Sequence, residues 1–228
     1  MGSFEDLSRK AENSAKRIDN VINKNGNVII VGHLDADGIT SSSLLGQAIR
    51  RRKGRFIARI LGEMSRDTLE SLKKGEYDFH ILCELGGGLV KDIEEFLGDR
   101  WLLVDHHQVP EVELEHDNVF NAWQFGYDGA REVSTTGMAY FIALAMDGRN
   151  ADLSWLSIIG CLGDAQDRSD SRSLTGLNRK VLDDAVRLGL VRLATDLILF
   201  GRETKPIHEA LASTTTPYIP SLSGNRDA

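Results

Sequence analysis

Acidic and histidine side chains occur in four clusters, and each cluster directly follows an apolar segment. The clusters consist of His33, Asp35 and Asp37; Glu84; Asp105, His106 and His107; and Asp164. Carboxylates gathered at one point repel one another unless a cation lies between them. Oxygen ligands with one or two imidazoles favour Mn²⁺ or Mg²⁺, whereas structural zinc sites usually contain thiolates. Two such ions, about 3.5 to 4 Å apart, would polarise a phosphate and activate water, so these residues predict phosphoester hydrolysis.

The clusters differ in how specifically they indicate metal binding. The segment Asp-Ala-Asp-Gly at 35–38 can bind metal or form an acidic turn, because Asp and Gly are common turn residues. Asp164 can bind metal or end an apolar helix as its C-cap. Asp105-His106-His107 is more specific, because adjacent side chains of an extended segment point to opposite sides. One histidine can then bind metal while the other faces a substrate.

The hydrophobic pattern predicts the elements that must position these side chains. Short apolar segments alternate with amphipathic ones, which predicts successive βαβ units and therefore an α/β fold with a parallel sheet flanked by helices. The predicted strands are 28–31, 56–60, 79–83, 101–104 and 118–121, and the helices among them are 4–22, 40–53, 67–73 and 90–97. Ligands of open parallel sheets bind beyond the carboxyl ends of the strands. The clusters are therefore expected to meet at one edge of the sheet.

The second half of the chain is mostly helical in this interpretation. The predicted helices are 136–146, 153–162, 177–188 and 191–200. Three of the four prolines follow residue 200, together with tracts rich in Ser and Thr. We therefore expect a catalytic domain over residues 1–200, and a linker or the start of a missing C-terminal domain over residues 201–228, as in a chain cut from a longer protein.

Composition restricts the class of protein. A chain of 228 residues with 41% apolar content can bury one good-sized core. The net charge of −7 argues against nucleic-acid binding through bulk electrostatics, but acidic residues in a metal site are compatible with a nucleic-acid substrate. Cys83 and Cys161 lie in apolar segments, as reduced intracellular thiols do. No segment approaches the roughly 18 to 20 apolar residues of a membrane span, and no signal peptide is evident, so we expect a cytoplasmic protein with no membrane partner.

Residues near the clusters could contact a phosphate, although each has a structural alternative. Gly86 and Gly87 either allow close approach of a substrate or form a flexible turn. Ser134 and Thr135 open a predicted helix, where free N–H groups can hold a phosphate and where the hydroxyls ordinarily act as caps. Arg168, just beyond the last cluster, is placed to meet a polyanion.

Other basic and histidine residues are expected to be structural. The basic run at 50–55 lies at the predicted C-terminus of a helix, where the macrodipole favours cations. His80 opens a predicted strand and is expected to be packed there. His116 and His208 are expected on the surface.

Taken together, four motifs resemble those of the DHH phosphoesterase superfamily, and within it the archaeal RecJ-like proteins. They are His33-Leu34-Asp35-Ala36-Asp37-Gly38, Cys83-Glu84-Leu85-Gly86, Asp105-His106-His107-Gln108 and Gly163-Asp164. The resemblance runs from about residue 28 to 188. It implies a nuclease that uses two Mn²⁺ or Mg²⁺ ions to hydrolyse single-stranded DNA or, in some relatives, RNA.

The resemblance also implies a role for each matching residue. Asp35 and Asp37 would ligate the two metals, and Glu84 would bridge them. His106 and Asp164 would complete the set of metal ligands, and Asp105 would orient a neighbour or ligate. His107 would face the scissile phosphate, and His33 would lie near the metal or the substrate.

One departure from the family pattern gives rise to an alternative. Glu84 stands where the family has Asp, and its extra methylene would move the bridging oxygens by about one C–C bond, in a type of site where roughly 1 Å can cost about 100-fold in rate. The alternative is a catalytically weak or inactive replication factor that docks the GINS complex or another replisome component. A third interpretation is a phosphoesterase of short oligonucleotides or nucleoside bisphosphates.

Overall fold

The computed structural model describes residues 3–168, 172–195 and 197–225, and divides into two compact units. The first unit is Met1–Val191 and the second is Arg192–Ala228. The first unit contains the sheet and all of the clustered acids and histidines. The assignment of a catalytic domain to residues 1–200, with a linker or further domain after it, stays a prediction.

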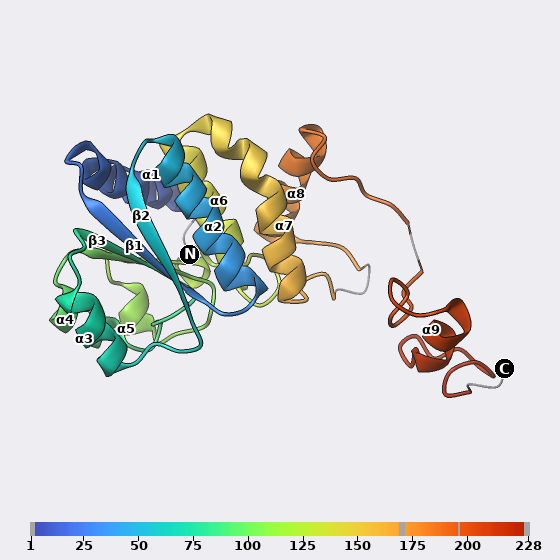
Figure 1. Cartoon of the computed structure of the whole chain (residues 1–228). Coiled ribbons are helices and arrows are strands. Elements are labelled where there is room, and N and C mark those ends of the chain that lie inside the picture. The colour runs from blue at the N-terminus through green and yellow to red at the C-terminus, as the bar shows by residue number, and fades with distance from the viewer. Residues whose placement is uncertain (1–2, 169–171, 196, 226–228) are drawn as a thin grey trace. The chain divides into compact units, whose positions relative to one another are not determined.

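A five-stranded parallel sheet forms the centre of the first unit (Figure 1). Its strands are β1 (Asn27–His33), β2 (Arg55–Leu61), β3 (Phe79–Cys83), β4 (Trp101–Asp105) and β5 (Val119–Asn121). Their order is β2-β1-β3-β4-β5, and every pairing is parallel, with Ile30 of β1 opposite Ile81 of β3. The order reverses direction between β1 and β3, which is where doubly wound sheets open a crevice for ligands. The predicted α/β fold is confirmed.

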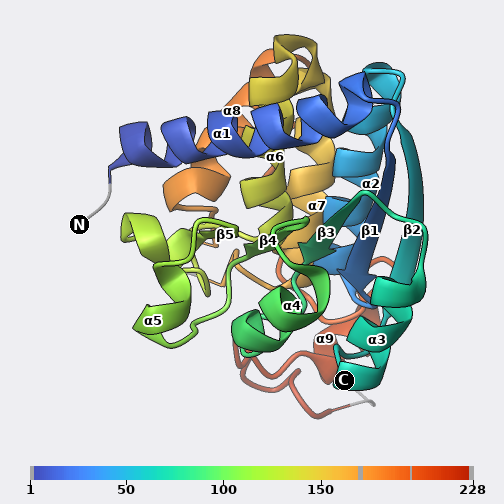
Figure 2. The same cartoon turned by 90° about the vertical axis from the view of Figure 1, so that its left-hand side faces the viewer.

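Helices cover both faces of this sheet (Figure 2). Alternate residues of the strands point to opposite faces, so Val28 and Ile30 enter one apolar core while Ile29 and Val31 enter the other. The helices of the first unit are α1 (Phe4–Asn23), α2 (Ala36–Arg51), α6 (Thr135–Met146), α7 (Ser154–Gly163) and α8 (Gly176–Arg187) around the larger core, α3 (Arg66–Lys74) and α4 (Val90–Leu97) on the smaller one, and the short α5 (Glu111–Leu114). The strands β3 and β4 are buried at every position, which explains why their residues other than His80 and Asp105 are apolar.

The start of α2 differs from the prediction. The helix begins at Ala36, four residues before the expected start at residue 40, because the carboxylate of Asp35 accepts a hydrogen bond from the Gly38 N–H (2.9 Å) and acts as the N-cap. Asp37 therefore lies in the first turn of a helix and is fixed by it. The predicted start of this helix at residue 40 was wrong, because the helix already includes three residues of the acidic segment 35–38.

The helix predicted over 191–200 is not formed by the described residues of that range, 191–195 and 197–200. Few of its apolar residues are packed, since Leu193, Leu197 and Phe200 are each more than half exposed, and most helical stability comes from packing an apolar face. The second unit contains one helix among its described residues, α9 (Ile207–Ser213).

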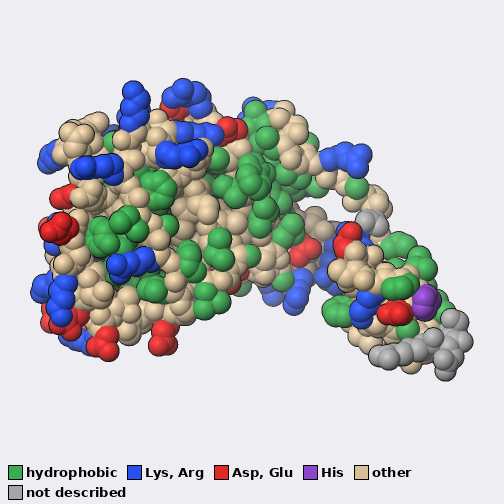
Figure 3. Space-filling model, viewed as in Figure 1, with side chains coloured by type: hydrophobic (Ala, Val, Ile, Leu, Met, Phe, Trp, Pro, Cys, Tyr) green, Lys and Arg blue, Asp and Glu red, His purple; other side chains and the backbone are tan. Residues whose placement is uncertain are grey.

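The basic run at 50–55 lies at the C-terminal end of α2, as predicted, and two of its residues form ion pairs. Arg51 forms a bidentate pair with Asp152 (2.6 and 2.9 Å), and Arg52 pairs with Asp19 (3.1 Å). Lys and Arg side chains gather along this upper edge of the first unit (Figure 3). In the described part of the chain, no helix combines the length and the apolar character that crossing a bilayer requires.

Candidate metal centre

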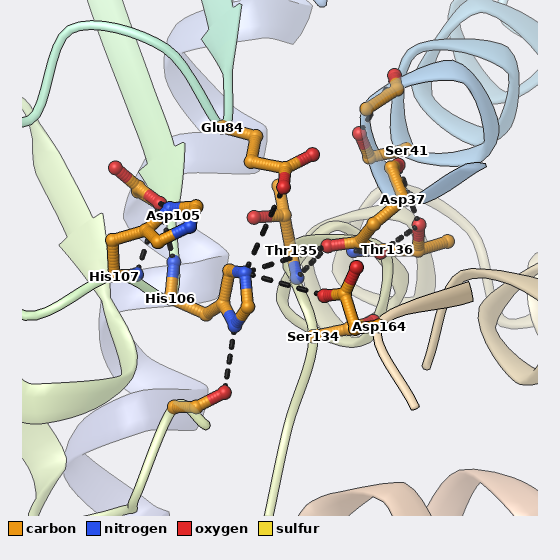
Figure 4. Close-up of polar contacts among 12 residues, drawn as sticks. Asp37, Ser41, Glu84, Asp105, His106, His107, Ser134, Thr135, Thr136 and Asp164 are labelled. Carbon is orange, nitrogen blue, oxygen red and sulfur yellow. Dashed lines mark hydrogen bonds and ion pairs between the residues drawn. The ribbon is translucent and has the colours of Figure 1, made fainter. Parts of the chain in front are cut away.

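The four clusters converge at the carboxyl edge of the sheet (Figure 4). Ligand atoms within 4.8 Å of one another form three groups: Asp37, Glu84, His106 and Asp164; His33, Asp35 and Glu84; and Glu84, His106 and His107. Glu84 belongs to every group. Seven of the eight predicted metal or catalytic residues thus meet at one place, from segments as far apart as residues 33 and 164.

In the first group, the acids surround His106 Nε2 at distances longer than a normal hydrogen bond. His106 Nε2 lies 3.4 Å from Asp164 Oδ2, 3.8 Å from Glu84 Oε1 and 3.9 Å from Asp37 Oδ2. In the second group, His33 Nδ1 lies 2.7 Å from Asp35 Oδ2 and 3.9 Å from Glu84 Oε1. Glu84 Oε1 therefore lies at a similar distance from a histidine of each group.

The orientation of His106 is set from outside the cluster. Its Nδ1 donates to the carbonyl oxygen of Gly129 at 2.6 Å, so that Nε2 points at the acids. This arrangement is the usual one for a histidine that binds metal through Nε2. Burial disfavours the charged imidazole, but the Glu84 and Asp37 carboxylates outweigh it and raise the pKa of His106 to about 10. In the absence of a cation, the acids therefore stabilise the protonated form of His106.

Three buried polar atoms of the cluster lack a partner that a cation could provide. Glu84 Oε2, His106 Nε2 and Asp164 Oδ2 are inaccessible and have no hydrogen-bond partner among the described residues. Burial raises the pKa of Glu84 to about 7 and the pKa of Asp164 to about 6, with Asp37 adding to both. Unpartnered buried groups are costly unless something satisfies them. A divalent cation among these oxygen and imidazole ligands would do so, and the residues fit Mn²⁺ or Mg²⁺.

Asp37 is completely buried and held by the N-terminus of α6. Its Oδ2 accepts the N–H of Thr135 at 2.6 Å, and its Oδ1 accepts the N–H of Thr136 at 2.9 Å. The Ser134 hydroxyl caps the same helix by accepting from the Gly137 N–H. The helix terminus thus holds a carboxylate of the protein itself, and Ser134 acts as its cap, which is one of the two alternatives that the sequence left open. A contact of Ser134 or Thr135 with a substrate stays a prediction.

Asp105 holds the two histidines that follow it. Its Oδ1 accepts from the backbone N–H groups of His106 (2.7 Å) and His107 (3.0 Å), and from Nδ1 of His107 (2.9 Å). Asp105 is in none of the three ligand groups, so orienting is the use that its contacts indicate. The side chain of His107 is 56% exposed, on the open side of the centre. A catalytic role for Asp105 and His107 stays a prediction.

The loop after β3 combines an unusual backbone with close packing. Glu84 has a φ of 67° and Gly86 a φ of 103°, both in the left-handed region. A Cβ at Gly87 would lie 2.8 Å from Asp105 Oδ2, so a larger residue would displace the carboxylate that orients the histidines. Arg168 is exposed. The substrate contacts predicted for Gly86, Gly87 and Arg168 stay predictions.

Some residues of the centre were not found from the sequence. Thr136 and Gly129 bond Asp37 and His106, and Gln166 donates to the same Gly129 carbonyl at 2.8 Å. No local pattern marks these positions. His80 is buried as predicted, whereas His116 is half-buried and stacks on Trp101 with ring centroids 4.8 Å apart, so its assignment to the surface was wrong.

Residues 27–161, more than half of the chain, match the family model described as DHH family, N-terminal domain. The chain belongs to the DHH family. An uncharacterized protein of Methanocaldococcus jannaschii is 28% identical over 213 residues, which are 91% of this chain and 48% of that protein. The chain therefore spans about half the length of the curated relative that it matches.

Solved structures share the fold of this DHH-family chain at low sequence identity. The exonuclease RecJ bound to manganese is 15% identical with a TM-score of 0.64, covering 78% of this chain and 47% of that one. CDC45 from Entamoeba histolytica is 15% identical with a TM-score of 0.60, covering 84% of this chain and 40% of that one. The fold is thus RecJ-like, as the motifs predicted.

Proposed function

We propose that this DHH-family protein is a metal-dependent phosphodiesterase that hydrolyses single-stranded DNA or RNA. The observation that carries the proposal is the position of Glu84, which is shared by the group of Asp37, His106 and Asp164 and by the group of His33 and Asp35. A shared carboxylate between two ligand groups suits two divalent ions. The similarity to a RecJ that binds manganese supports Mn²⁺ or Mg²⁺ as these ions.

Bound divalent ions would polarise the phosphate and lower the pKa of a water molecule. The protein's part is to hold the ligands in place before the substrate arrives. Asp37 is fixed by α6, and His106 is fixed through Gly129. Asp105 holds the exposed ring of His107 at the open side, where it can contact a phosphate oxygen or move a proton.

The proposal is tested by calorimetric titration with MnCl₂ together with hydrolysis of labelled single-stranded oligonucleotides. We expect Mn²⁺ uptake and Mn²⁺-dependent hydrolysis by the wild type, and loss of both in Asp164→Asn. The control is Asp67→Asn, which removes an exposed acid from the first turn of α3. No uptake at millimolar Mn²⁺ would contradict the proposal, and faster turnover of dinucleotides than of long strands would favour a small-substrate phosphoesterase.

A second candidate is a non-hydrolysing replication factor that docks GINS or another replisome component. Two observations favour it, the replacement of the family's Asp by Glu84 and the similarity of the fold to CDC45. This candidate predicts that GINS is retained in a pull-down equally by the wild type and by Asp164→Asn, while the wild type shows no hydrolysis. Hydrolysis by the wild type without retention of GINS would exclude it.

A further inference from the structure

The carboxylate of Asp37 has two oxygens in different surroundings. Oδ1 accepts two hydrogen bonds from one residue, the N–H of Thr136 at 2.9 Å and its hydroxyl at 2.6 Å. Oδ2 accepts one, from the N–H of Thr135, and is the oxygen that lies 3.9 Å from His106 Nε2. Oδ2, which accepts one hydrogen bond fewer than Oδ1, is thus the oxygen that faces the other ligands.

The Thr136 hydroxyl is itself held by a neighbour. It lies 2.7 Å from the hydroxyl of Thr40, whose oxygen is equally close to the Ala36 carbonyl, to which it donates. The Thr136 hydroxyl thus lies between Thr40 and Asp37 Oδ1, within hydrogen-bond distance of both.

Gly160 of α7 lies directly against the bonded oxygen of Asp37 and the Thr136 hydroxyl. A Cβ at this position would lie 2.4 Å from Asp37 Oδ1 and 2.5 Å from the Thr136 hydroxyl oxygen. Three helices, α2, α6 and α7, therefore meet where Oδ1 is bonded. With Thr40, Thr136 and Asp37 all buried, the hydrogen bonds of Oδ1 lie away from bulk water.

We propose that Thr136 is a positioning residue, whose hydroxyl saturates Asp37 Oδ1 and so presents Oδ2 alone to the metal. The inference rests on the proposed function, because it assumes that Asp37 is a metal ligand. Partners of this kind, which contact a ligand and not the ion, typically change metal affinity by about 10- to 100-fold when they are removed.

The structure provides a matched control in the adjacent residue. The hydroxyl oxygen of Thr135 is buried and has no hydrogen-bond partner among the described residues, while its N–H makes the bond to Asp37. Thr→Val is nearly isosteric and keeps the backbone N–H. Thr135→Val therefore removes a hydroxyl from the same buried helix turn without touching the carboxylate. Thr136→Val removes the bond to Oδ1, and Thr40 then keeps a bond to the Ala36 carbonyl at 2.7 Å.

The experiment measures Mn²⁺ affinity by calorimetry and thermal unfolding without metal for the wild type, Thr136→Val, Thr136→Ser and Thr135→Val. We expect Thr136→Val to bind Mn²⁺ about 10- to 100-fold more weakly, and Thr136→Ser and Thr135→Val to bind as the wild type does. Equal affinity in Thr136→Val and Thr135→Val would overturn the inference, as would a loss in Thr136→Ser equal to that in Thr136→Val. A lower unfolding temperature in Thr136→Val with wild-type affinity would show a structural role only.

The same measurements separate this inference from the proposed function. If the wild type binds Mn²⁺ and hydrolyses oligonucleotides while Thr136→Val keeps its affinity, the inference alone fails. If the wild type binds no Mn²⁺, both fail.

Discussion

Oε1 of Glu84 lies 3.8 Å from Nε2 of His106, although the two side chains extend from the ends of different strands, β3 and β4. The same oxygen lies 3.9 Å from Nδ1 of His33, at the end of β1. The longer side chain of Glu, on a backbone with a φ of 67°, thus reaches a point between two ligand groups. At this position the Glu84 carboxylate lies within reach of the ligands of both groups.

Glu84→Asp should therefore weaken the centre instead of restoring it. Shortening the side chain withdraws the carboxylate by about 1.5 Å, and in a preorganised site a displacement of about 1 Å can lower the rate by about 100-fold. We expect weaker Mn²⁺ binding by calorimetry and slower oligonucleotide hydrolysis. Glu63→Asp, at an exposed position, is the control. A large gain in hydrolysis would show instead that Glu84 compromises the site.

Divalent metal should stabilise the folded protein. The unpartnered atoms of Glu84, His106 and Asp164 exist in this arrangement only when the chain is folded. At a free Mn²⁺ concentration of 100 times Kd, the free energy of unfolding should rise by about 2.7 kcal/mol. Denaturant titrations with MnCl₂ and with EDTA measure this difference, and Asp164→Ala should reduce it. Identical transitions in the two solutions would argue against a metal centre.

Gly160→Ala should damage both packing and metal binding. The added methyl group would overlap Asp37 Oδ1 at 2.4 Å, so α7 must move or the carboxylate must turn. We expect destabilisation of about 1–3 kcal/mol and a weaker affinity for Mn²⁺. Gly148→Ala is the matched control, since a Cβ there meets nothing within 4 Å. If both variants unfold and bind Mn²⁺ alike, the close approach of α7 to Asp37 is not rigid.

His80 should make stability depend on pH. Its Nδ1 donates to the Arg100 carbonyl at 3.0 Å, its Nε2 is buried without a partner among the described residues, and burial lowers its pKa. Below about pH 6.5, the unfolded chain binds a proton that the folded chain does not, so the free energy of unfolding falls as pH decreases. The contribution is at most about 1.4 kcal/mol per pH unit.

The measurement is denaturant unfolding in EDTA between pH 7.5 and about 5. His80→Asn should reduce the acid slope, because Asn keeps a donor near the position of Nδ1 and takes up no proton. His208→Asn, exposed in the second unit, is the control. An unchanged slope in His80→Asn would mean that other groups cause the acid dependence.

Local pattern was sufficient to predict the strands and most helices, and through them the convergence of the clusters. The segments 79–83 and 90–97 were predicted with the bounds that the structure has. The first is a short apolar segment between Asp78 and Glu84, and the second is an amphipathic segment that ends at Gly98. The start of α2 was missed since Gly38 suggested a turn. A Cβ there would lie 2.5 Å from the backbone of His33, so this Gly is required by the packing of the helix against β1.

Long-range contacts were beyond the reach of the sequence. The bonds between Asp37 and Thr136 join residues that are 99 positions apart, and a Thr at the start of a helix looks the same whether or not it holds an acid. The helix predicted at 191–200 shows the converse case, in which a local pattern is present but the contacts that would stabilise the helix are not. Its apolar spacing is helical, but Leu193 and Phe200 remain exposed. Periodicity indicates which residues could share a face, not whether another surface is available to cover it.

The buried strands β3 and β4 have a consequence for which positions of the chain can be substituted independently. Their apolar residues fill the two cores, while Glu84 and His106 come only after the packed segments have ended and belong to neither core. The side chains at this edge can therefore be exchanged without removing an apolar contact from the sheet, and position 84 is one where chemistry and core packing depend on different residues.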